Sequence, residues 1–321
     1  MNNINYPLVT IGVVTYNSGD FILETLDSIK SQTYPNIELI VSDDCSADDT
    51  VEKCQKWFED NAKSFVNAEL VTSPINTGVS GNSNRAFSKA TGEWYKLMDG
   101  DDILMPNAIM DYICFVQANP RIRLVFAPAI HFVEHFDREN VGEPDVISHY
   151  YYRESMTAKK QAKVIAKRFL GSGPTCFVLK KAIDEIGGFD ERFPLLEDYP
   201  LLINLICNGN KLYLMDTPTV YKRIRANSIQ YEKDEQSLFS KSTVRCTKEY
   251  KLLYQREHLG PLWRMLLSYS IWLKNKVIDS GNSPKIASSS RWYKLYKLTD
   301  PFLIYSRKVL RKSNAYLKGQ Q

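Results

Sequence analysis

The sequence lacks the features of proteins that cross membranes, carry disulfides or bind structural zinc. It has no apolar run of about 18 residues, so we expect no transmembrane helix. The six cysteines are scattered without a C-x-x-C pair and the four histidines do not cluster, which argues against a zinc site and indicates reduced thiols. Residues 1–7 have neither the basic region nor the apolar stretch of a signal peptide. These absences together predict a cytoplasmic protein.

Acidic residues are scarce in one part of the chain. Residues 241–321 contain 17 Lys and Arg but only 4 Asp and Glu, whereas residues 1–240 contain 24 and 33. The basic part mixes these cations with aromatic residues, which predicts helices that lie at an inner-membrane surface, peripheral on its cytoplasmic face. The alternative is a helical subdomain that packs on the rest of the protein with a solvated basic face. No nucleic-acid-binding motif is recognisable, so nucleic acid is not a predicted partner.

The order of apolar runs predicts an α/β fold. Short β-branched runs without polar alternation are typical of strands buried on both faces, and they alternate with helical patterns of about ten residues. This alternation predicts βαβ units and a doubly wound, mostly parallel sheet flanked by helices. Strands are expected at 9–16, 37–41, 68–72, 93–97, 124–127, 175–179, 211–215 and 219–224, and helices at 21–31, 50–61, 79–90, 105–119, 201–207 and from about 233 onward.

Polar residues follow the first four of these strands. They stand at 16–17, 43–44, 73–78 and 99–102. Ligands of open α/β sheets bind at the carboxyl ends of the strands, so we expect these four segments to form one binding site. A polar, irregular segment at 137–155, with three consecutive tyrosines, is typical of a binding loop.

The last of these four strand-end segments, residues 99–102, is an acidic cluster. Asp99, Asp101 and Asp102 fall within four residues, directly after a predicted strand. Like charges this close repel one another, and a hard divalent cation such as Mg²⁺ or Mn²⁺ would make the cluster favourable. The alternative is a solvated, acid-rich helix N-terminus, because aspartate is favoured there.

Taken in order, these motifs resemble those of the family 2 inverting glycosyltransferases of bacterial surface-polysaccharide synthesis, which have the GT-A fold. The resemblance covers about the first 230 residues. It implies a GT-A domain at 1–232, with a nucleotide-binding half at 1–104 and an acceptor half at 105–232, followed by a basic, aromatic-rich helical extension at 233–321. The motifs that carry it are Val14-Thr15-Tyr16-Asn17, Val41-Ser42-Asp43-Asp44-Cys45-Ser46, Asn76-Thr77-Gly78-Val79-Ser80-Gly81-Asn82, Ala90-Thr91-Gly92-Glu93-Trp94, Asp99-Gly100-Asp101-Asp102 and Glu197-Asp198.

The resemblance implies the reaction and its partners. A sugar would pass from a nucleoside diphosphate donor, expected to be a UDP sugar, to a hydroxyl of a glycan or lipid-linked acceptor in one inverting displacement. Mn²⁺ or Mg²⁺ would be the cofactor. Asp101 matches the metal ligand of the D-x-D motif, and Asp99 matches its first acid, which orients the sugar, the ribose or a metal-bound water. Asp102 is expected to cap the following helix.

The resemblance also assigns the donor site. Tyr16, with Thr15 and Asn17 beside it, would stack on the base, and Asp44 would accept a hydrogen bond from the base N3–H, with Asp43 as the alternative. Gly78 would allow close approach of the backbone. The family commonly has an arginine at the position of Ser83, and Arg85 either replaces its contact or only forms an ion pair on a helix face. The other donor-binding residues that the resemblance implies are Asn76 and Asn84.

Two later motifs are expected to supply the catalytic general base and the contacts to the diphosphate. Asp198 matches the general base of the family's E-D motif, and Glu197 would support it; the alternative for Asp198 is an acid at a helix N-terminus. Arg225 stands where the family often has a histidine, and it would grip the diphosphate together with Arg223.

Two other functions stay open at this stage. The departures at Cys45, Ser83 and Arg225 keep alive a non-catalytic module that binds nucleotide or scaffolds an assembly. A sugar-phosphate nucleotidylyltransferase would also use a doubly wound sheet, but it needs a glycine-rich, basic loop after the first strand, and residues 16–19 do not supply one.

Overall fold

The computed structural model describes residues 6–139, 141–144, 155–166, 173–225, 260–280, 290–305 and 307–308. The chain divides into two compact units. The first contains Met1–Ile147 and Gly171–Arg223, and the second contains Ser148–Leu170 and Ile224–Gln321. A segment of the predicted GT-A domain therefore groups with the C-terminal extension. The domain boundary near residue 232 stays a prediction.

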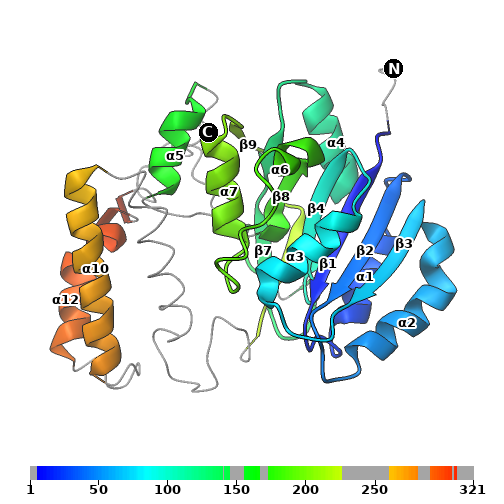
Figure 1. Cartoon of the computed structure of the whole chain (residues 1–321), viewed down its shortest axis with the longest axis horizontal. Helices are drawn as coiled ribbons and strands as arrows, with labels where there is room; N and C mark the ends of the chain where they lie inside the picture. Colours follow the sequence, from blue (N-terminus) through cyan, green and yellow to red (C-terminus); the bar gives the residue numbers. More distant parts are fainter. Residues whose placement is uncertain are drawn as a thin grey trace. The chain divides into compact units, whose positions relative to one another are not determined.

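A seven-stranded sheet forms the centre of the first unit (Figure 1). Strands β3, β2, β1 and β4 are parallel neighbours, β8 runs antiparallel between β4 and β6, and β9 pairs parallel with β6. The prediction of a mostly parallel sheet is confirmed. In sheet order the strands are β3 (Asn67–Thr72), β2 (Ile37–Asp43), β1 (Val9–Thr15), β4 (Trp94–Asp99), β8 (Cys176–Leu179), β6 (Leu124–Phe126) and β9 (Leu212–Leu214).

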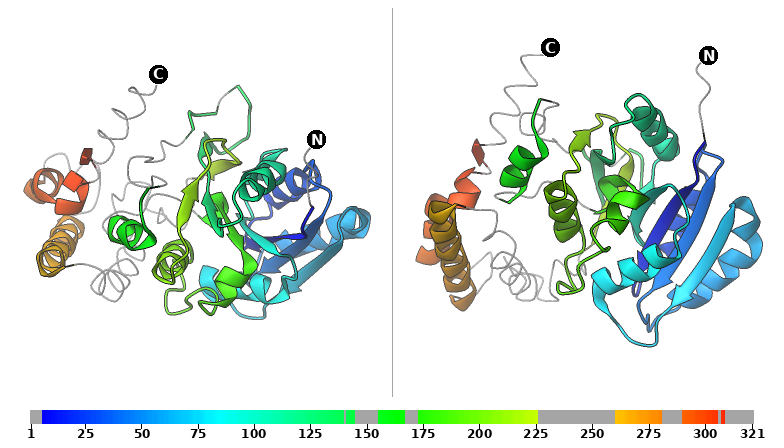
Figure 2. Two further views of the ribbon diagram at one scale, coloured as in Figure 1. Left: turned by 90° about the horizontal axis from the view of Figure 1, so that it is seen from above. Right: turned by 45° about the horizontal axis from the view of Figure 1, so that its top comes forward.

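Helices cover both faces of this sheet (Figures 1 and 2). Alternate β1 residues, from Val9 to Val13, belong to one core cluster with buried side chains of α1 (Ile22–Lys30), α2 (Thr50–Asn61) and α4 (Ala108–Gln117). On the other face, α3 (Gly78–Lys89) packs on β1 and β2, and its Phe87 ring meets Tyr95 of β4 edge to face. A strand with apolar residues on both faces needs this double cover.

A smaller sheet lies beside the carboxyl end of β4. Its strands are β5 (Ile103–Leu104), β10 (Val220–Ile224) and β7 (Ala129–Val133), in that order. Tyr221 of β10 pairs antiparallel with Ile103 of β5. The β5–β10 pairing therefore brings residues 222–223 next to the acidic cluster, although about 120 residues separate the two segments in sequence.

The remaining described elements of the first unit are two 3₁₀ turns and two helices. The 3₁₀ turn η2 (Gly173–Thr175) leads into β8, and α7 (Asp198–Cys207) carries the E-D motif at its start. A second 3₁₀ turn, η1 (Ala62–Ser64), follows α2, and the short α6 (Lys180–Asp184) follows β8. The predicted helices at 105–119 and 201–207 exist, but they begin at Ala108 and Asp198.

The second unit is helical in its described parts. These are α5 (Ala158–Ile165), α10 (Pro261–Asp279) and α12 (Arg291–Thr299). Helices α10 and α12 pack through aromatic contacts, including Trp272 on Trp292, and Tyr269 shares a hydrogen bond with Thr299. None of the helices that the structure describes combines the length and apolar character that crossing a bilayer requires. Most of the predicted loop at 137–155 and the whole region at 226–259 lie outside the described residues.

Candidate active site

The carboxyl ends of β1, β2 and β4 lie side by side, as the sequence predicts. Thr15 is opposite Asp43 in the β1–β2 pair, and Val14 is opposite Asp99 in the β1–β4 pair. Asn17 adopts a positive φ of 48° and fastens the two tips together: its backbone N–H donates to Ser46 Oγ, and its Oδ1 accepts from the N–H of Ala47. The predicted donor-site segments therefore start from one edge of the sheet.

The predicted base-stacking residues occupy different environments. Tyr16 keeps 43% of its surface exposed at the tip of β1, so its ring is available to a ligand. Thr15 is buried, and a Cβ at Gly100 would meet its side chain at 2.9 Å, so it fixes the approach of the β4 tip. The side-chain oxygen of Asn17 already accepts a hydrogen bond from the Ala47 N–H.

Asp44 is a buried carboxylate that the protein itself surrounds with donors. It accepts from the backbone N–H groups of Thr77 and Gly78, from the Thr77 hydroxyl at 2.7 Å, and from Arg85 Nη2 at 3.2 Å. These bonds hold the segment after β3 against the end of β2. The alternative acid, Asp43, accepts from the backbone N–H and the hydroxyl of Ser46 instead.

Arg85 is placed by α3 to brace the base-site carboxylate. Besides Asp44, its guanidinium donates to the Asp43 carbonyl and to the side chains of Asn82 and Thr77. Of the two sequence-based alternatives, the ion pair is therefore the one observed, and it is internal rather than on an open helix face.

Asn84 and Gly78 both contact the segment at 188–194. Asn84 exchanges two hydrogen bonds with the backbone of Phe189, donating to its carbonyl and accepting from its N–H. Gly78 has a φ of +80°, and a Cβ there would lie 2.4 Å from the Pro194 carbonyl oxygen. Gly78 therefore permits a close approach of the chain itself, and its predicted approach to the donor stays a prediction. Asn76 accepts from the Gly78 N–H and stabilises the same turn.

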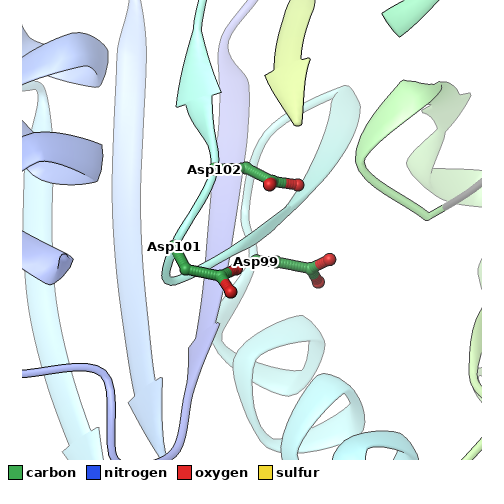
Figure 3. Close-up of side chains that lie close together, drawn as sticks. All are labelled: Asp99, Asp101 and Asp102. Atoms are coloured by element: carbon green, nitrogen blue, oxygen red, sulfur yellow. The ribbon is translucent and has the colours of Figure 1, made fainter. Parts of the chain in front are cut away.

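Three carboxylates gather at the carboxyl end of β4 and form the acidic cluster. Asp99, Asp101 and Asp102 each offer a carboxylate oxygen, and these oxygens lie within 4.8 Å of one another. Asp99 is the last residue of β4, and the other two follow it in the turn; Figure 3 shows their carboxyl groups directed to the same side. Asp102 is buried, and its Oδ2 has no hydrogen-bond partner. Carboxylate oxygens gathered in this way fit a hard divalent cation.

The expected helix cap at Asp102 is wrong. Helix α4 begins at Ala108 with Asn107 before it, because residues 103–104 form β5. Asp102 Oδ1 instead accepts from the backbone N–H of Arg223, 2.9 Å away. The strand pairing thus turns Asp102 into the cluster, and its burial raises its pKa to about 7.

Lys222 supplies the positive charge at this centre. Its Nζ lies 3.4 Å from Asp99 Oδ2 and 3.7 Å from Asp102 Oδ2. Burial lowers the pKa of Lys222, but the surrounding carboxylates outweigh that effect and hold the pKa above its usual range. The ammonium is therefore fully charged at neutral pH.

The E-D motif forms a second pair of acids. Asp198 opens α7, and its Oδ1 accepts from the Tyr199 N–H at 2.6 Å. Burial raises the pKa of Asp198 to about 6, against the opposing charge of Lys222. Burial and the charge of Asp198 also raise the pKa of Glu197, well above its usual value. A carboxylate with a pKa near 6 is suited to accept a proton at neutral pH.

A buried lysine holds the turn beside this pair. Lys96 of β4 is fully buried and donates to the Pro174 carbonyl in η2. A Cβ at the neighbouring Gly173 would lie 3.3 Å from Glu197 Oε1. The sheet therefore fixes the backbone that faces the E-D pair.

The predicted phosphate contact of Arg223 is wrong. Its guanidinium is buried between the rings of Phe21 and Phe132 and donates to the carbonyl oxygens of Asp101 and Glu134 and to the carboxylate of Glu24. It therefore holds the backbone of the acidic loop. Arg225 belongs to the second unit, and its contact with a diphosphate stays a prediction.

Sequence reasoning passed over Lys222 and misassigned Asp102. Both follow from the β5–β10 pairing, which no local pattern in the sequence specifies. One signal was present: side chains alternate along a strand, so Lys222 and Arg223 face opposite ways and only one of them can reach the carboxylate groups of the cluster.

Comparison with known proteins identifies the family. Residues 10–187 match the model of glycosyl transferase family 2, which is more than half of the chain. The chain belongs to glycosyltransferase family 2. The match contains the strand-end motifs and the acidic cluster, but it ends before Asp198.

Two relatives of this family 2 chain are named for reactions on lipid-linked glycans. A GalNAc(5)-diNAcBac-PP-undecaprenol β-1,3-glucosyltransferase of Campylobacter jejuni is 27% identical over 226 residues, 70% of this chain and 67% of that enzyme. The Escherichia coli UDP-Glc:α-D-GlcNAc-diphosphoundecaprenol β-1,3-glucosyltransferase WfaP is 25% identical over 228 residues, 70% of this chain and 81% of WfaP. An uncharacterised Sinorhizobium fredii protein is 26% identical over 203 residues, 63% of this chain but only 20% of that protein.

Solved structures confirm the GT-A fold. Staphylococcus aureus TarS 1-349 in complex with UDP-GlcNAc has a TM-score of 0.55 and 18% identity, covering 97% of this chain and 92% of TarS 1-349. The mannosyltransferase PcManGT from Pyrobaculum calidifontis in complex with GDP-Man and Mn²⁺ has a TM-score of 0.51 and 19% identity, covering 97% of this chain and 76% of PcManGT. At these identities the likeness establishes the fold of the chain.

Proposed function

We infer that this family 2 protein is an inverting glycosyltransferase that moves a sugar from a UDP sugar to a hydroxyl of a glycan or lipid-linked acceptor. The observation that carries the proposal is the gathering of Asp99, Asp101 and Asp102 at the carboxyl end of β4, in the same compact unit as Asp198 and its raised pKa. The names of the C. jejuni and E. coli relatives support the acceptor class, and the UDP-GlcNAc complex of TarS supports the donor class.

Asp198 is the proposed general base. Its carboxylate would take the proton of the acceptor hydroxyl as that oxygen attacks the anomeric carbon from the face opposite the diphosphate. One displacement of this kind breaks the bond from the anomeric carbon to the diphosphate oxygen and inverts the anomeric configuration. Burial and the charge of Asp198 raise the pKa of Glu197 well above its usual value, which favours the neutral form of Glu197 beside the base.

The acidic cluster would hold Mn²⁺ or Mg²⁺ through Asp101 and Asp99, with Asp102 as a third carboxylate. When bound, such an ion supplies positive charge to the leaving nucleoside diphosphate. The Mn²⁺ complex of PcManGT supports this assignment. Tyr16 would stack on the base, and the hydrogen bond from the base N3–H to Asp44 stays a prediction. Asp44 and Asn76 also hold the turn at residues 76–78.

The second unit supports a membrane-surface location. Large apolar side chains are exposed on its helices, with Met265 and Leu262 of α10 and Leu298 of α12 each more than 60% exposed. Cations such as Lys294 and Lys297 stand on the same short helix as Leu298. Apolar and basic side chains on one helical unit suit an anionic lipid surface, where a lipid-linked acceptor would be found.

The first test is a thermal-shift panel of nucleotide sugars with Mn²⁺ or with EDTA, followed by a transfer assay with the donor that binds. A ligand that binds only the folded state raises its melting temperature. We expect one UDP sugar to do so with Mn²⁺ and little with EDTA, and to yield UDP with an added acceptor. Binding without turnover on any acceptor would instead favour the non-catalytic module.

A further inference from the structure

The ammonium of Lys222 lies where a divalent cation would need the same oxygens. Its Nζ is 3.4 Å from Asp99 Oδ2 and 3.7 Å from Asp102 Oδ2, and both residues belong to the carboxylate cluster. Asp102 Oδ2 is buried and has no hydrogen-bond partner, so Lys222 is the cation that partly compensates it. The centre is thus already supplied with one positive charge by the chain.

The backbone around Lys222 is fixed, while its side chain is long. Tyr221 pairs with Ile103, and the Arg223 N–H donates to Asp102 Oδ1, so the strand on either side of Lys222 is tied to the acidic loop. The Lys222 side chain retains 22% exposure. Four flexible carbons and an open side allow the ammonium to change partner without moving the strand.

A divalent ion and this ammonium repel each other if both lie among the three carboxylates. At a separation of about 4 Å, even an effective dielectric of about 20 leaves unit charges interacting strongly. One of the two cations must therefore weaken its contacts when the other binds. The diphosphate of a donor offers the ammonium a new partner, because phosphate oxygens accept hydrogen bonds from lysine.

We propose that Lys222 is a resident counter-cation of the acidic centre, which competes with the divalent ion for Asp99 and Asp102 until the donor arrives. Lys222 is thus a positioning residue for metal binding. This rests on the proposed function for the identity of the donor, but the competition itself concerns only the protein and the ion. This competition weakens the binding of a divalent ion to the nucleotide-free protein.

The test measures Mn²⁺ binding to the full chain without nucleotide, from the electron paramagnetic resonance signal of free Mn²⁺. We expect Lys222→Met to bind Mn²⁺ at least about tenfold more tightly than the native protein, which corresponds to about 1.4 kcal/mol. Lys222→Arg, which keeps the charge, should bind as weakly as the native protein. Lys89→Met, which removes an equal charge from an exposed ion pair, should change nothing. With UDP added, the advantage of Lys222→Met should shrink.

Equal or weaker Mn²⁺ binding by Lys222→Met would overturn the proposal, and so would the absence of measurable binding in every variant. Sugar transfer that persists in EDTA alongside the latter result would leave the glycosyltransferase function intact. If Lys222→Met does not fold, Lys222→Gln carries the same test, because its amide can still donate to Asp99 while lacking the charge.

Discussion

Two buried carboxylates at the carboxyl ends of strands in the same sheet differ in how many hydrogen-bond donors surround them. Asp44, at the end of β2, accepts hydrogen bonds from two backbone N–H groups, one hydroxyl and one guanidinium. Asp102, just past β4, accepts one hydrogen bond at Oδ1, and its Oδ2 accepts none. A carboxylate that the protein satisfies stabilises the fold, whereas one left without donors is costly unless a ligand completes it. Asp44 therefore braces the β2 end of the sheet, and Asp102 at the β4 end is left with an oxygen that the proposed ion would complete.

Lys222 and Arg85 extend the same contrast. Arg85 donates to five oxygen atoms, and its ion pair with Asp44 is part of a connected network. Lys222 has two carboxylates at distances longer than an ideal ammonium–carboxylate contact. The cation at the β2 end is therefore immobilised, and the cation at the β4 end is replaceable.

The largest effect is expected from Asp198→Asn. An amide cannot take a proton from the acceptor, so the transfer rate should fall by about 10²- to 10⁴-fold while donor binding stays near native. Steady-state transfer and donor-induced thermal shifts measure the two quantities separately. Asp184→Asn, on the exposed face of α6, is the matched control. A variant that kept its rate within about threefold would remove Asp198 from the base role.

Asp44→Asn tests the braced side of the comparison. The amide nitrogen would face donors, and Arg85 would lose its charged partner in a largely buried network. We expect the free energy of unfolding to fall by about 2–4 kcal/mol, measured by urea denaturation. Glu69→Gln, which breaks an exposed ion pair, should cost less than about 1 kcal/mol. Equal losses in the two variants would show that Asp44 is no brace.

Much of this edge follows from sequence, because it depends on local patterns. The buried runs at β1 and β2 and the helices after them are predicted within about two residues, and the strand-end rule places Asp44 and Asp99 together. Asp102 and Arg223 could not be assigned this way. Their environments come from β5–β10 pairing between segments far apart in the chain, and helix-cap chemistry is an equally good local explanation for an aspartate before a helix.

Asn84 shows the same limit on a smaller scale. Its position on α3 is predicted from the motif, but its side chain bonds to the backbone of Phe189. The segment at 188–194 reaches α3 only in the folded chain. A motif therefore predicts which residues lie near the site, and tertiary contacts determine whether a side chain meets the ligand or supports the backbone.

The pH dependence of transfer tests the raised pKa of Asp198. The base must be deprotonated, and burial raises its pKa to about 6, so the rate should be maximal above pH 7 and fall as the pH drops through 6. Below pH 5 the fall should approach about tenfold per pH unit. The single-turnover rate with bound donor, checked by circular dichroism for retained fold, provides the profile. A rate that stayed constant down to pH 4.5 would place the pKa of the base in its ordinary range.

The smallest effect is expected from Asp102→Asn without metal. Burial raises the pKa of Asp102 to about 7, so the folded state loses stability as the pH rises from the ordinary carboxyl pKa to about 7, and the cost is largest above pH 7. Asparagine keeps an oxygen for the Arg223 N–H and carries no charge. At pH 8 in EDTA we therefore expect a change between zero and a gain of about 1 kcal/mol, shrinking at pH 5, because the lost contact with Lys222 offsets part of the benefit. Urea denaturation at both pH values measures it. A loss above about 2 kcal/mol at pH 8 would mean that Asp102, like Asp44, stabilises the fold without a bound ion, and the contrast between the two ends of the sheet edge would disappear.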